Sequence, residues 1–322
     1  MIEEIADLAL GPAEVTEVDR LARGVCADGR DPVDSPEWVA RARYNWDELP
    51  LGLRRGVREF RRHSGPRGLL ILHGLPVDEP MLPATPSTPD SVQRSATVPA
   101  AVLTMLACGL GDPAAYLAEK SGALVQDVVP VRGKESFSGN AGSVLLTFHN
   151  ENAFHRHEPD YVLLLCLRAD HDRSAGLRTA CLREALPLLT AASREVLFAP
   201  EFITAPPPSF PSDKGIRAPQ PILSGAVEDP DVRMATIATT ALTPRAEAAL
   251  AEFGRACNTV ARITRLVPGD MAILDNRVTV HGRTAFRPRY DGADRWVQRT
   301  FAIADLRSSR DHRPHDGYVL TR

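Results

Sequence analysis

The chain has 322 residues, of which 43% are hydrophobic and 25% charged, with ordinary numbers of glycine (22) and proline (27). This composition is typical of a globular protein with an apolar core and excludes a disordered, collagen-like or coiled-coil chain. Lysine plus arginine (38) nearly balance aspartate plus glutamate (41), and no long block of one sign occurs. The balance argues against a nucleic-acid or anionic-membrane partner, so we expect a small-molecule partner.

The first residues have neither the basic start nor the long apolar run of a signal peptide. No stretch approaches the ~18 consecutive apolar residues of a membrane span, and we therefore expect a cytoplasmic protein. The five cysteines are odd in number and lack CxxC spacing, which is typical of reduced, structural thiols.

Helical periodicity dominates residues 1–65, where apolar residues three and four apart recur over Val15–Val25 and Leu51–Phe60. Gly68–Leu72 then predicts a short buried strand. Residues 79–98, rich in proline, serine and threonine, predict a long surface loop. Such a loop is either a lid over a site or a plain connection.

A further helical pattern at about 99–120 precedes a part of the chain dominated by strands. Strands are predicted at Leu124–Val131, Val144–Phe148, Tyr161–Leu167, Arg178–Leu182 and Trp296–Ile303, and helices at Leu186–Phe198 and Pro244–Val260, the last with Thr243 as N-cap. The turn signal Val267–Asp270 predicts a β-hairpin between Ile263–Leu266 and Met271–Leu274. The polar tail Arg307–Pro314 is predicted to be poorly ordered.

This order of elements predicts a mainly β fold with flanking helices, a sandwich or barrel rather than an alternating βαβ sheet. Neither GxGxxG nor GxxxxGK[ST] occurs. Dinucleotide-binding and P-loop functions are therefore disfavoured.

A histidine cluster directly follows the predicted strand Val144–Phe148. His149 and Glu151, two residues apart on an extended chain, point to the same face and can meet one metal ion. His281, in a strand-like run, can supply a third ligand. Two imidazoles and one carboxylate are the facial triad of non-haem Fe(II) oxygenases, which leaves three positions for co-substrate and dioxygen.

Two alternatives to the iron site remain for these histidines. His149, His155 and His157 together are an alternative zinc cluster. His281 alone is equally an ordinary polar residue near a sheet edge.

Arg295 and Arg299 are spaced so that both can face inward on one strand. A guanidinium offers a planar fork to a carboxylate and stays charged when partly buried. The pair therefore suits a dicarboxylate co-substrate, although a surface strand that alternates arginine with apolar residues has the same pattern.

Five motifs occur in order along the chain: Ala123–Val131, Phe148–His155, Pro159–Arg168, Leu274–Arg283 and Tyr290–Arg299. In these motifs the chain resembles the clavaminate synthase-like 2-oxoglutarate oxygenases, close to the free amino acid hydroxylases that act on L-arginine or L-asparagine. The resemblance covers roughly residues 65–305 and is far more specific than the HxE pair. It implies a single oxygenase domain over 1–322 with a double-stranded β-helix (jelly roll) core at 124–305. The residue patterns add a helical scaffold at 1–65 and a candidate lid loop at 79–98.

The resemblance also implies roles by position. His149, Glu151 and His281 would bind Fe(II), and Arg295 with Thr179 would bind the distal carboxylate of 2-oxoglutarate. Arg299 would pair with the α-carboxylate of an amino acid, while Asn140 and Glu119 fall near positions that bind the substrate's polar groups. From the residues alone, Thr179 is equally an ordinary strand hydroxyl and Asn140 a turn residue.

The activity implied is hydroxylation of an unactivated C–H bond, at the β or γ carbon of a free L-amino acid, in specialised metabolite (antibiotic) biosynthesis. Dioxygen is consumed, and succinate and CO2 are released. The carboxylate at Glu151 argues against the related halogenases, in which a small residue leaves room for chloride. Desaturation and cyclisation begin with the same hydrogen abstraction and stay open.

One departure from the family bears on the substrate. In the arginine and asparagine enzymes, acidic residues follow a stretch like Asp229–Arg233 and meet the substrate side chain, whereas Met234, Ala235 and Thr236 stand here. An unpaired buried charge is costly, so we expect a less basic or less polar substrate side chain. The alternatives are an amino acid tethered to a carrier protein and a catalytically silent metal-binding barrel.

Overall fold

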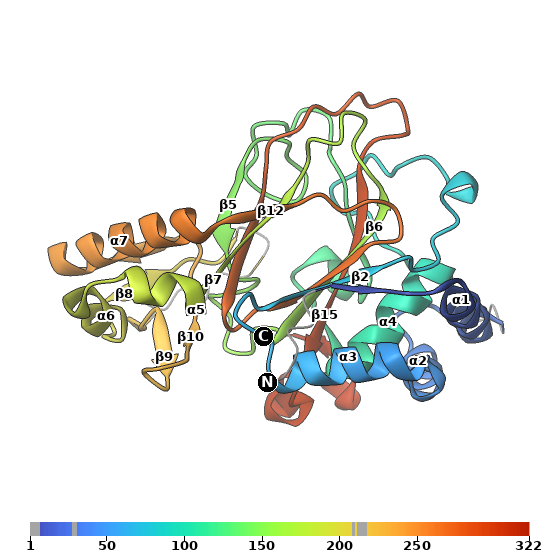
Figure 1. Cartoon of the computed structure of the whole chain (residues 1–322), viewed down its shortest axis with the longest axis horizontal. Helices are drawn as coiled ribbons and strands as arrows, with labels where there is room; N and C mark the ends of the chain where they lie inside the picture. The colour runs from blue at the N-terminus through green and yellow to red at the C-terminus, as the bar shows by residue number, and fades with distance from the viewer. Residues whose placement is uncertain (1–6, 28–30, 208–209, 211–217, 322) are drawn as a thin grey trace.

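The computed structural model describes residues 7–27, 31–207, 210 and 218–321. Two facing β-sheets form its centre, and helices pack on the outer side of each (Figure 1). The helices are α1 (Pro12–Cys26), α2 (Pro36–Glu48), α3 (Leu51–Arg62), α4 (Val98–Leu110), α5 (Leu182–Ala185), α6 (Ala191–Leu197) and α7 (Pro244–Val260). Short 3-10 turns are η1 (Glu79–Met81), η2 (Lys120–Gly122), η3 (Leu186–Leu188), η4 (Leu306–His312) and η5 (Pro314–Asp316).

The larger sheet has eight strands within the described ranges. In spatial order these are β1 (Asp7–Ala9), β2 (Leu69–His73), β13 (Met271–Asp275), β6 (Tyr161–Arg168), β15 (Trp296–Ile303), β3 (Asp112–Tyr116) and β16 (Val319–Leu320), and β4 (Gln126–Val128) also pairs with β15. The smaller sheet has the order β12 (Arg262–Thr264), β7 (Leu177–Cys181), β14 (Thr279–Arg283) and β5 (Leu146–His149). Two further pairs are β8 (Phe202–Thr204) with β11 (Thr239–Ala241), and β9 (Leu223–Gly225) with β10 (Pro230–Val232).

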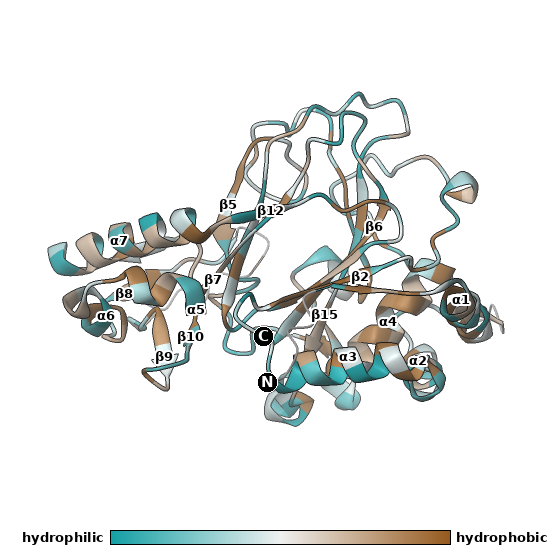
Figure 2. Ribbon diagram, in the orientation of Figure 1, coloured by the Kyte–Doolittle hydropathy of each residue, from teal (hydrophilic) through white to brown (hydrophobic). Residues whose placement is uncertain are grey.

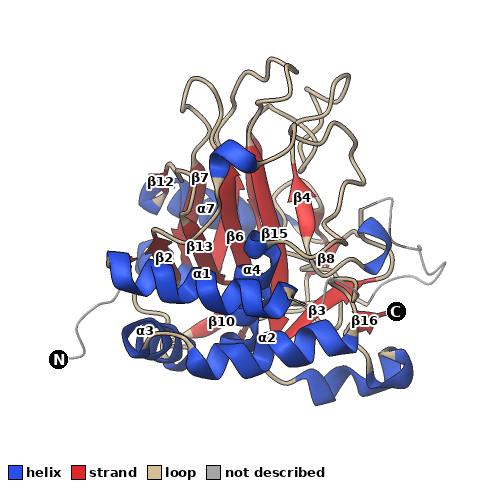
Figure 3. Cartoon of the chain, turned by 90° about the vertical axis from the view of Figure 1, so that its right-hand side faces the viewer, coloured by secondary structure: helices blue, strands red, loops and turns tan. Residues whose placement is uncertain are grey.

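The N-terminal helices cover the outer face of the larger sheet (Figure 3). Helix α4 is apolar around most of its circumference (Figure 2), as expected for a helix buried between a sheet and other helices. Along β6, Leu163 and Leu165 pack against these helices, while Val162 and Leu164 point to the other side. This alternation follows from the two-residue period of a strand and leaves an apolar inner face toward the smaller sheet.

The smaller sheet has the opposite arrangement. Its outer face carries Phe148, Ala180 and Val280, which pack against α5, α6 and α7. Because side chains alternate along a strand, His281 next to Val280 points inward, between the two sheets. The candidate site therefore lies in the interior of the sandwich.

Several predicted elements are confirmed: helix α7 spans the predicted residues, with the Thr243 hydroxyl accepting the N–H of Ala246, and β15 matches Trp296–Ile303. The predicted hairpin is wrong. Asp270 closes the turn onto Val267 at 2.9 Å, but β12 pairs with β7 in the smaller sheet and β13 pairs with β2 and β6 in the larger one. The turn is a crossover between sheets.

Two other predictions are corrected. The helix predicted over 99–120 ends at Leu110, and β3 follows because Asp112–Tyr116 pairs with β15. The tail is ordered instead of loose: buried Arg313 donates to the carbonyls of Leu306 and Gly317 and fixes the turn of η4.

Residues 79–98 form η1 and an extended loop attached at several points. The N–H of Thr85 donates to Gly292 O at 2.8 Å, and that of Gln93 donates to Val125 O at 3.0 Å. Ser91 Oγ donates to the buried Asp127 carboxylate at 2.6 Å. These bonds hold the loop against β4, and its role as a lid stays a prediction. None of the helices in the described part of the chain is long and apolar enough to cross a membrane.

Candidate active site

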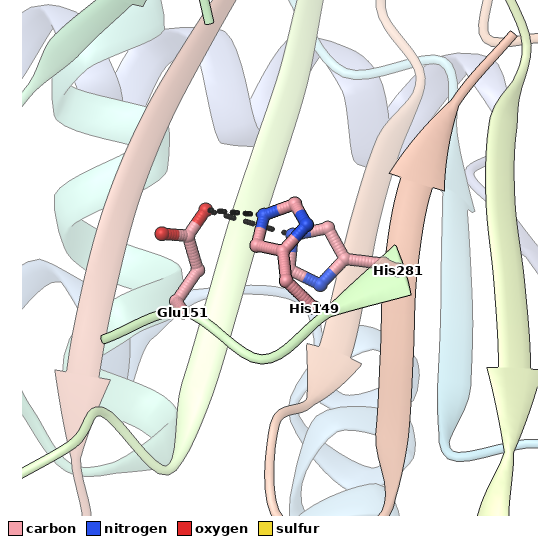
Figure 4. Close-up of side chains that lie close together, drawn as sticks. All are labelled: His149, Glu151 and His281. Atoms are coloured by element: carbon pink, nitrogen blue, oxygen red, sulfur yellow. Dashed lines mark ion pairs between the residues drawn. The ribbon is translucent and has the colours of Figure 1, made fainter. Parts of the chain in front are cut away.

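The three predicted metal ligands converge between the sheets (Figure 4). His281 on β14 and His149 at the end of β5 are register partners, with ring centroids 4.5 Å apart. Glu151 follows β5, and its Oε1 lies 3.5 Å from His281 Nε2 and 3.9 Å from His149 Nε2. All three side chains are largely buried. The donor atoms can therefore face one ion.

The backbone at Glu151 is fixed by a buried asparagine that sequence reasoning did not single out. Asn276 is fully buried, accepts the N–H of Glu151 at 2.9 Å and donates to Glu151 O at 3.1 Å. The Asn150 amide in turn donates to Asn276 O at 2.6 Å. Asn276 lies inside the motif Leu274–Arg283, but its local spacing carries no signal because its partners are far away in the chain.

The protonation of the site suits a divalent cation. His149 Nδ1 faces Thr147 O at 2.9 Å, so this nitrogen carries the proton and Nε2 keeps a lone pair for a metal. Burial lowers the pKa of His281. Burial also opposes protonation of His149, but the hydrogen bond and charge of Glu151 outweigh it and raise the pKa of His149. Burial opposes ionisation of Glu151, but Arg299 and the two histidines hold the pKa of that carboxyl well below its usual range. An anionic carboxylate between two imidazoles fits Fe(II).

Arg299 joins the metal site to a second set of polar side chains. It is fully buried on β15, and its Nη1 donates to Glu151 Oε1 at 2.6 Å. Its Nη2 donates to Glu119 and to Gln126. Burial alone would lower the pKa of Arg299, but the carboxylates of Glu151 and Glu119 raise it.

A pocket at the triad is lined by residues of both sheets and of the loops beside them, among them Asn140, Arg283, Arg295 and Arg299. Arg295 precedes β15, and Arg283 ends β14. Burial lowers the pKa of Arg295; burial, together with the charge of Arg295, lowers that of Arg283 to about 9. Sequence reasoning missed Arg283, although its position two residues after His281 on one strand was an available signal.

The other predicted site residues lie at different distances from this pocket. Asn140 lines it. Glu119 does not line it but reaches it through Arg299, and its Oε2 accepts from Asn152 Nδ2 at 3.5 Å. Thr179 is buried and pairs with His281 across β7 and β14, yet it lines a different cavity, together with Cys181. Asn140, Arg295 and Arg299 thus lie with the triad, and Thr179 lies next to it.

The alternative zinc cluster is wrong. His155 packs edge-on against Tyr116, with centroids 4.8 Å apart, and His157 packs against His312 at 5.0 Å. Neither shares an ion-sized space with His149.

The stretch that departs from the family pattern lies directly against the metal site. Ala235 is the bridge partner of His149, and side chains of directly opposed residues lie on the same face. Met234 is instead buried in the core between the smaller sheet and α5–α7, and Thr236 Oγ1 donates to Phe148 O at 2.7 Å. Of the three positions, Ala235 therefore faces the same side as the His149 imidazole.

Comparison with known proteins decides the family. The chain is 56% identical over 314 residues to L-asparagine oxygenase of Streptomyces coelicolor, covering 98% of this chain and 94% of that one. It is 36% identical over 261 residues to clavaminate synthase 2 of Streptomyces clavuligerus, covering 80% of each. Residues 220–301 match the family described as taurine catabolism dioxygenase TauD, TfdA family. The chain belongs to the TauD/TfdA family.

A solved structure supports the same assignment for the cofactors. Asparagine oxygenase in complex with Fe(II), 2S,3S-3-hydroxyasparagine and succinate matches with a TM-score of 0.96 at 56% identity, over 98% of this chain and 99% of that one. The predicted class, an iron- and 2-oxoglutarate-dependent oxygenase of the clavaminate synthase-like type, is confirmed for this TauD/TfdA member.

Proposed function

We propose that this oxygenase hydroxylates carbon 3, the β carbon, of a free L-amino acid whose side chain is uncharged. The observation that carries the proposal is the single pocket in which His149, Glu151 and His281 lie together with Arg295 and Arg299. Carbon 3 is the position hydroxylated in the product bound to the related asparagine oxygenase. One dioxygen and one 2-oxoglutarate are consumed for each hydroxyl formed, and succinate and CO2 leave.

Different residues would bind the iron, the 2-oxoglutarate and the amino acid. His149, Glu151 and His281 would hold Fe(II), which with 2-oxoglutarate and dioxygen supplies the oxidising power for the C–H bond. Arg295 would bind the distal carboxylate of 2-oxoglutarate, with Thr179 beside it.

Arg299 would bind the α-carboxylate of the amino acid, because a buried guanidinium next to the metal ligands fixes which carbon faces the iron. Glu119, on the other side of Arg299, would accept the α-ammonium group, and Asn140 would bind the side chain. A thioester-tethered amino acid lacks the free carboxylate that Arg299 would bind, so a carrier protein is not required.

Ala235 favours an uncharged side chain on the substrate. Its methyl group faces the same side as His149 and offers neither charge nor hydrogen bond. A cationic side chain placed there would be desolvated without a partner. An uncharged substrate side chain on this side of His149 avoids that cost.

We further assign the two facing sheets to the double-stranded β-helix (jelly roll) core of a single domain. The arrangement of an eight-stranded and a four-stranded sheet around an interior site supports this assignment. The names of the relatives favour a role in specialised metabolite biosynthesis.

The test is an anaerobic titration of metal-free protein with Fe(II) and 2-oxoglutarate, followed by a panel of free L-amino acids. The iron chelate has a weak visible charge-transfer band, and the substrate is expected to shift it. Product analysis after admission of air should then show one added oxygen at carbon 3 and equimolar succinate. No band, or a band that only cationic amino acids shift, contradicts the proposal.

A further inference from the structure

The pocket beside the triad holds more positive charge than the surrounding protein balances. Arg299 is paired with Glu119 and Glu151. Within the described ranges, neither Arg283 nor Arg295 forms an ion pair. Arg295 also lines a second cavity with Asp170, but the carboxylate oxygens of Asp170 accept the N–H groups of Ser174 and Ala175. Buried cations without a partner are costly, so the pocket is complete only with an anionic ligand.

Arg283 is held in place but keeps donors free. Only 4% of the residue is exposed. One Nη2–H donates to Val144 O at 3.0 Å, and the buried Nε has no hydrogen-bond partner. A guanidinium carries five N–H donors, so most of those of Arg283 stay available to a ligand.

Arg283 and Arg295 both line the pocket, and both lie near the ring of Phe286. The guanidinium carbon of Arg283 lies 5.0 Å from the ring centroid of Phe286, and that of Arg295 lies 6.0 Å from it. Both side chains line the pocket that also contains His281. Both guanidiniums thus lie against one aromatic ring, whose attraction for cations partly offsets their mutual repulsion.

We propose that Arg283 is a second co-substrate-binding residue, which acts with Arg295 on the distal carboxylate of 2-oxoglutarate and so makes the pocket selective for dicarboxylic 2-oxo acids. This inference rests on the proposed use of 2-oxoglutarate at this site. A monocarboxylic 2-oxo acid could still chelate the metal but would leave both guanidiniums unpaired. Selectivity for the dicarboxylate therefore depends on two arginines instead of one.

The test measures binding without turnover. Fe(II)-loaded protein is titrated anaerobically with 2-oxoglutarate and with 2-oxovalerate, which has a methyl group in place of the distal carboxylate, and heat and the visible band are recorded. The readout is the Kd for 2-oxovalerate divided by the Kd for 2-oxoglutarate. Arg283→Gln is expected to weaken 2-oxoglutarate binding about tenfold or more while 2-oxovalerate stays within about twofold.

The controls separate charge from structure. Arg287→Gln removes an exposed arginine of the same segment and should leave both Kd values unchanged. Arg295→Met should lower the ratio as Arg283→Gln does. If Arg283→Gln does not fold, Arg283→Lys keeps the buried charge without the planar fork and should lower the ratio several-fold.

Two results overturn the inference in distinguishable ways. If the Arg283 variants weaken both acids equally, or neither, while wild type prefers 2-oxoglutarate, the residue is only structural. If wild type itself binds neither acid, the proposed function is wrong, and this inference with it.

Discussion

Nη1 of Arg299 donates to Oε1 of Glu151 at 2.6 Å, and the same oxygen faces Nε2 of His281 at 3.5 Å. One carboxylate oxygen thus belongs both to the metal site and to the arginine proposed to hold the substrate. Glu119 and Gln126 hold Arg299 from the other side. The orientation of Glu151 therefore depends on Arg299, and metal binding and substrate binding are linked through this pair.

Arg299→Met should weaken Fe(II) binding by about tenfold, because loss of a partner that orients a metal ligand typically costs that much. It should also lower the free energy of unfolding by about 3 kcal/mol, since the buried Glu151 and the partly buried Glu119 lose their cation. Fe(II) affinity by equilibrium dialysis and urea denaturation measure the two effects. Glu151→Ala is the reference and should abolish succinate formation. Unchanged Fe(II) affinity in Arg299→Met would show that Glu151 is oriented by its backbone alone.

Ala235→Asp should change the substrate preference toward cationic amino acids. The new carboxylate would lie on the side of the His149 imidazole and supply the partner that a guanidinium or ammonium side chain lacks in the wild type. The ratio of kcat/KM for L-arginine to that for the best uncharged substrate should rise about tenfold or more. Thr240→Asp, at an exposed position of β11, is the matched control. Equal ratios in the two variants would remove Ala235 from the wall of the substrate site.

Local patterns predicted the elements better than their pairing. The apolar period and the Thr243 cap lie within the helix they define, so α7 could be located from its own residues. The turn at Val267–Asp270 was also visible, but nothing in it shows that β12 continues the smaller sheet and β13 the larger one. That choice is made by β7, β2 and β6, whose contacts with these strands are distant in sequence.

The candidate site, too, was predicted where the signal is local and missed where it depends on contacts distant in sequence. The spacing of His149 and Glu151 indicated a shared face, and His281 in a strand-like run was an available third ligand. The resemblance then assigned all three to Fe(II). Asn276 was missed because an amide that clamps a distant backbone is recognised only by what surrounds it. Arg283 offered its even spacing from His281 as a signal, but its unpartnered buried Nε is visible only in the structure. The roles given to Thr179, Asn140 and Glu119 stay predictions.

Asn276→Ala should disturb the metal site although Asn276 does not reach the pocket. The variant leaves the N–H and C=O of Glu151 buried without partners, at a cost of about 2 kcal/mol in the free energy of unfolding. Fe(II) affinity should fall by about tenfold. Asn258→Ala, on the exposed part of α7, is the control and should change neither quantity appreciably. A stability loss with normal Fe(II) affinity would limit Asn276 to a structural role.

His73 on β2 should make part of the stability depend on pH. Its Nδ1 lies 2.8 Å from Asp270 Oδ1, and although burial lowers the pKa of His73, the bond and charge of Asp270 outweigh this and raise it. Because the folded pKa exceeds the unfolded value of about 6.5, the stabilisation is fully present below about pH 6.5 and is lost as pH rises through the folded pKa. With 40% of the side chain exposed, solvent screening limits it to less than about 1 kcal/mol. Urea denaturation of His73→Gln should therefore show a larger deficit in the free energy of unfolding at pH 5.5 than at pH 9. Asp270→Asn should reduce this difference, leaving only the longer contact of His73 with Asp7 at 3.4 Å. An equal deficit at both pH values would mean that the ion pair contributes nothing.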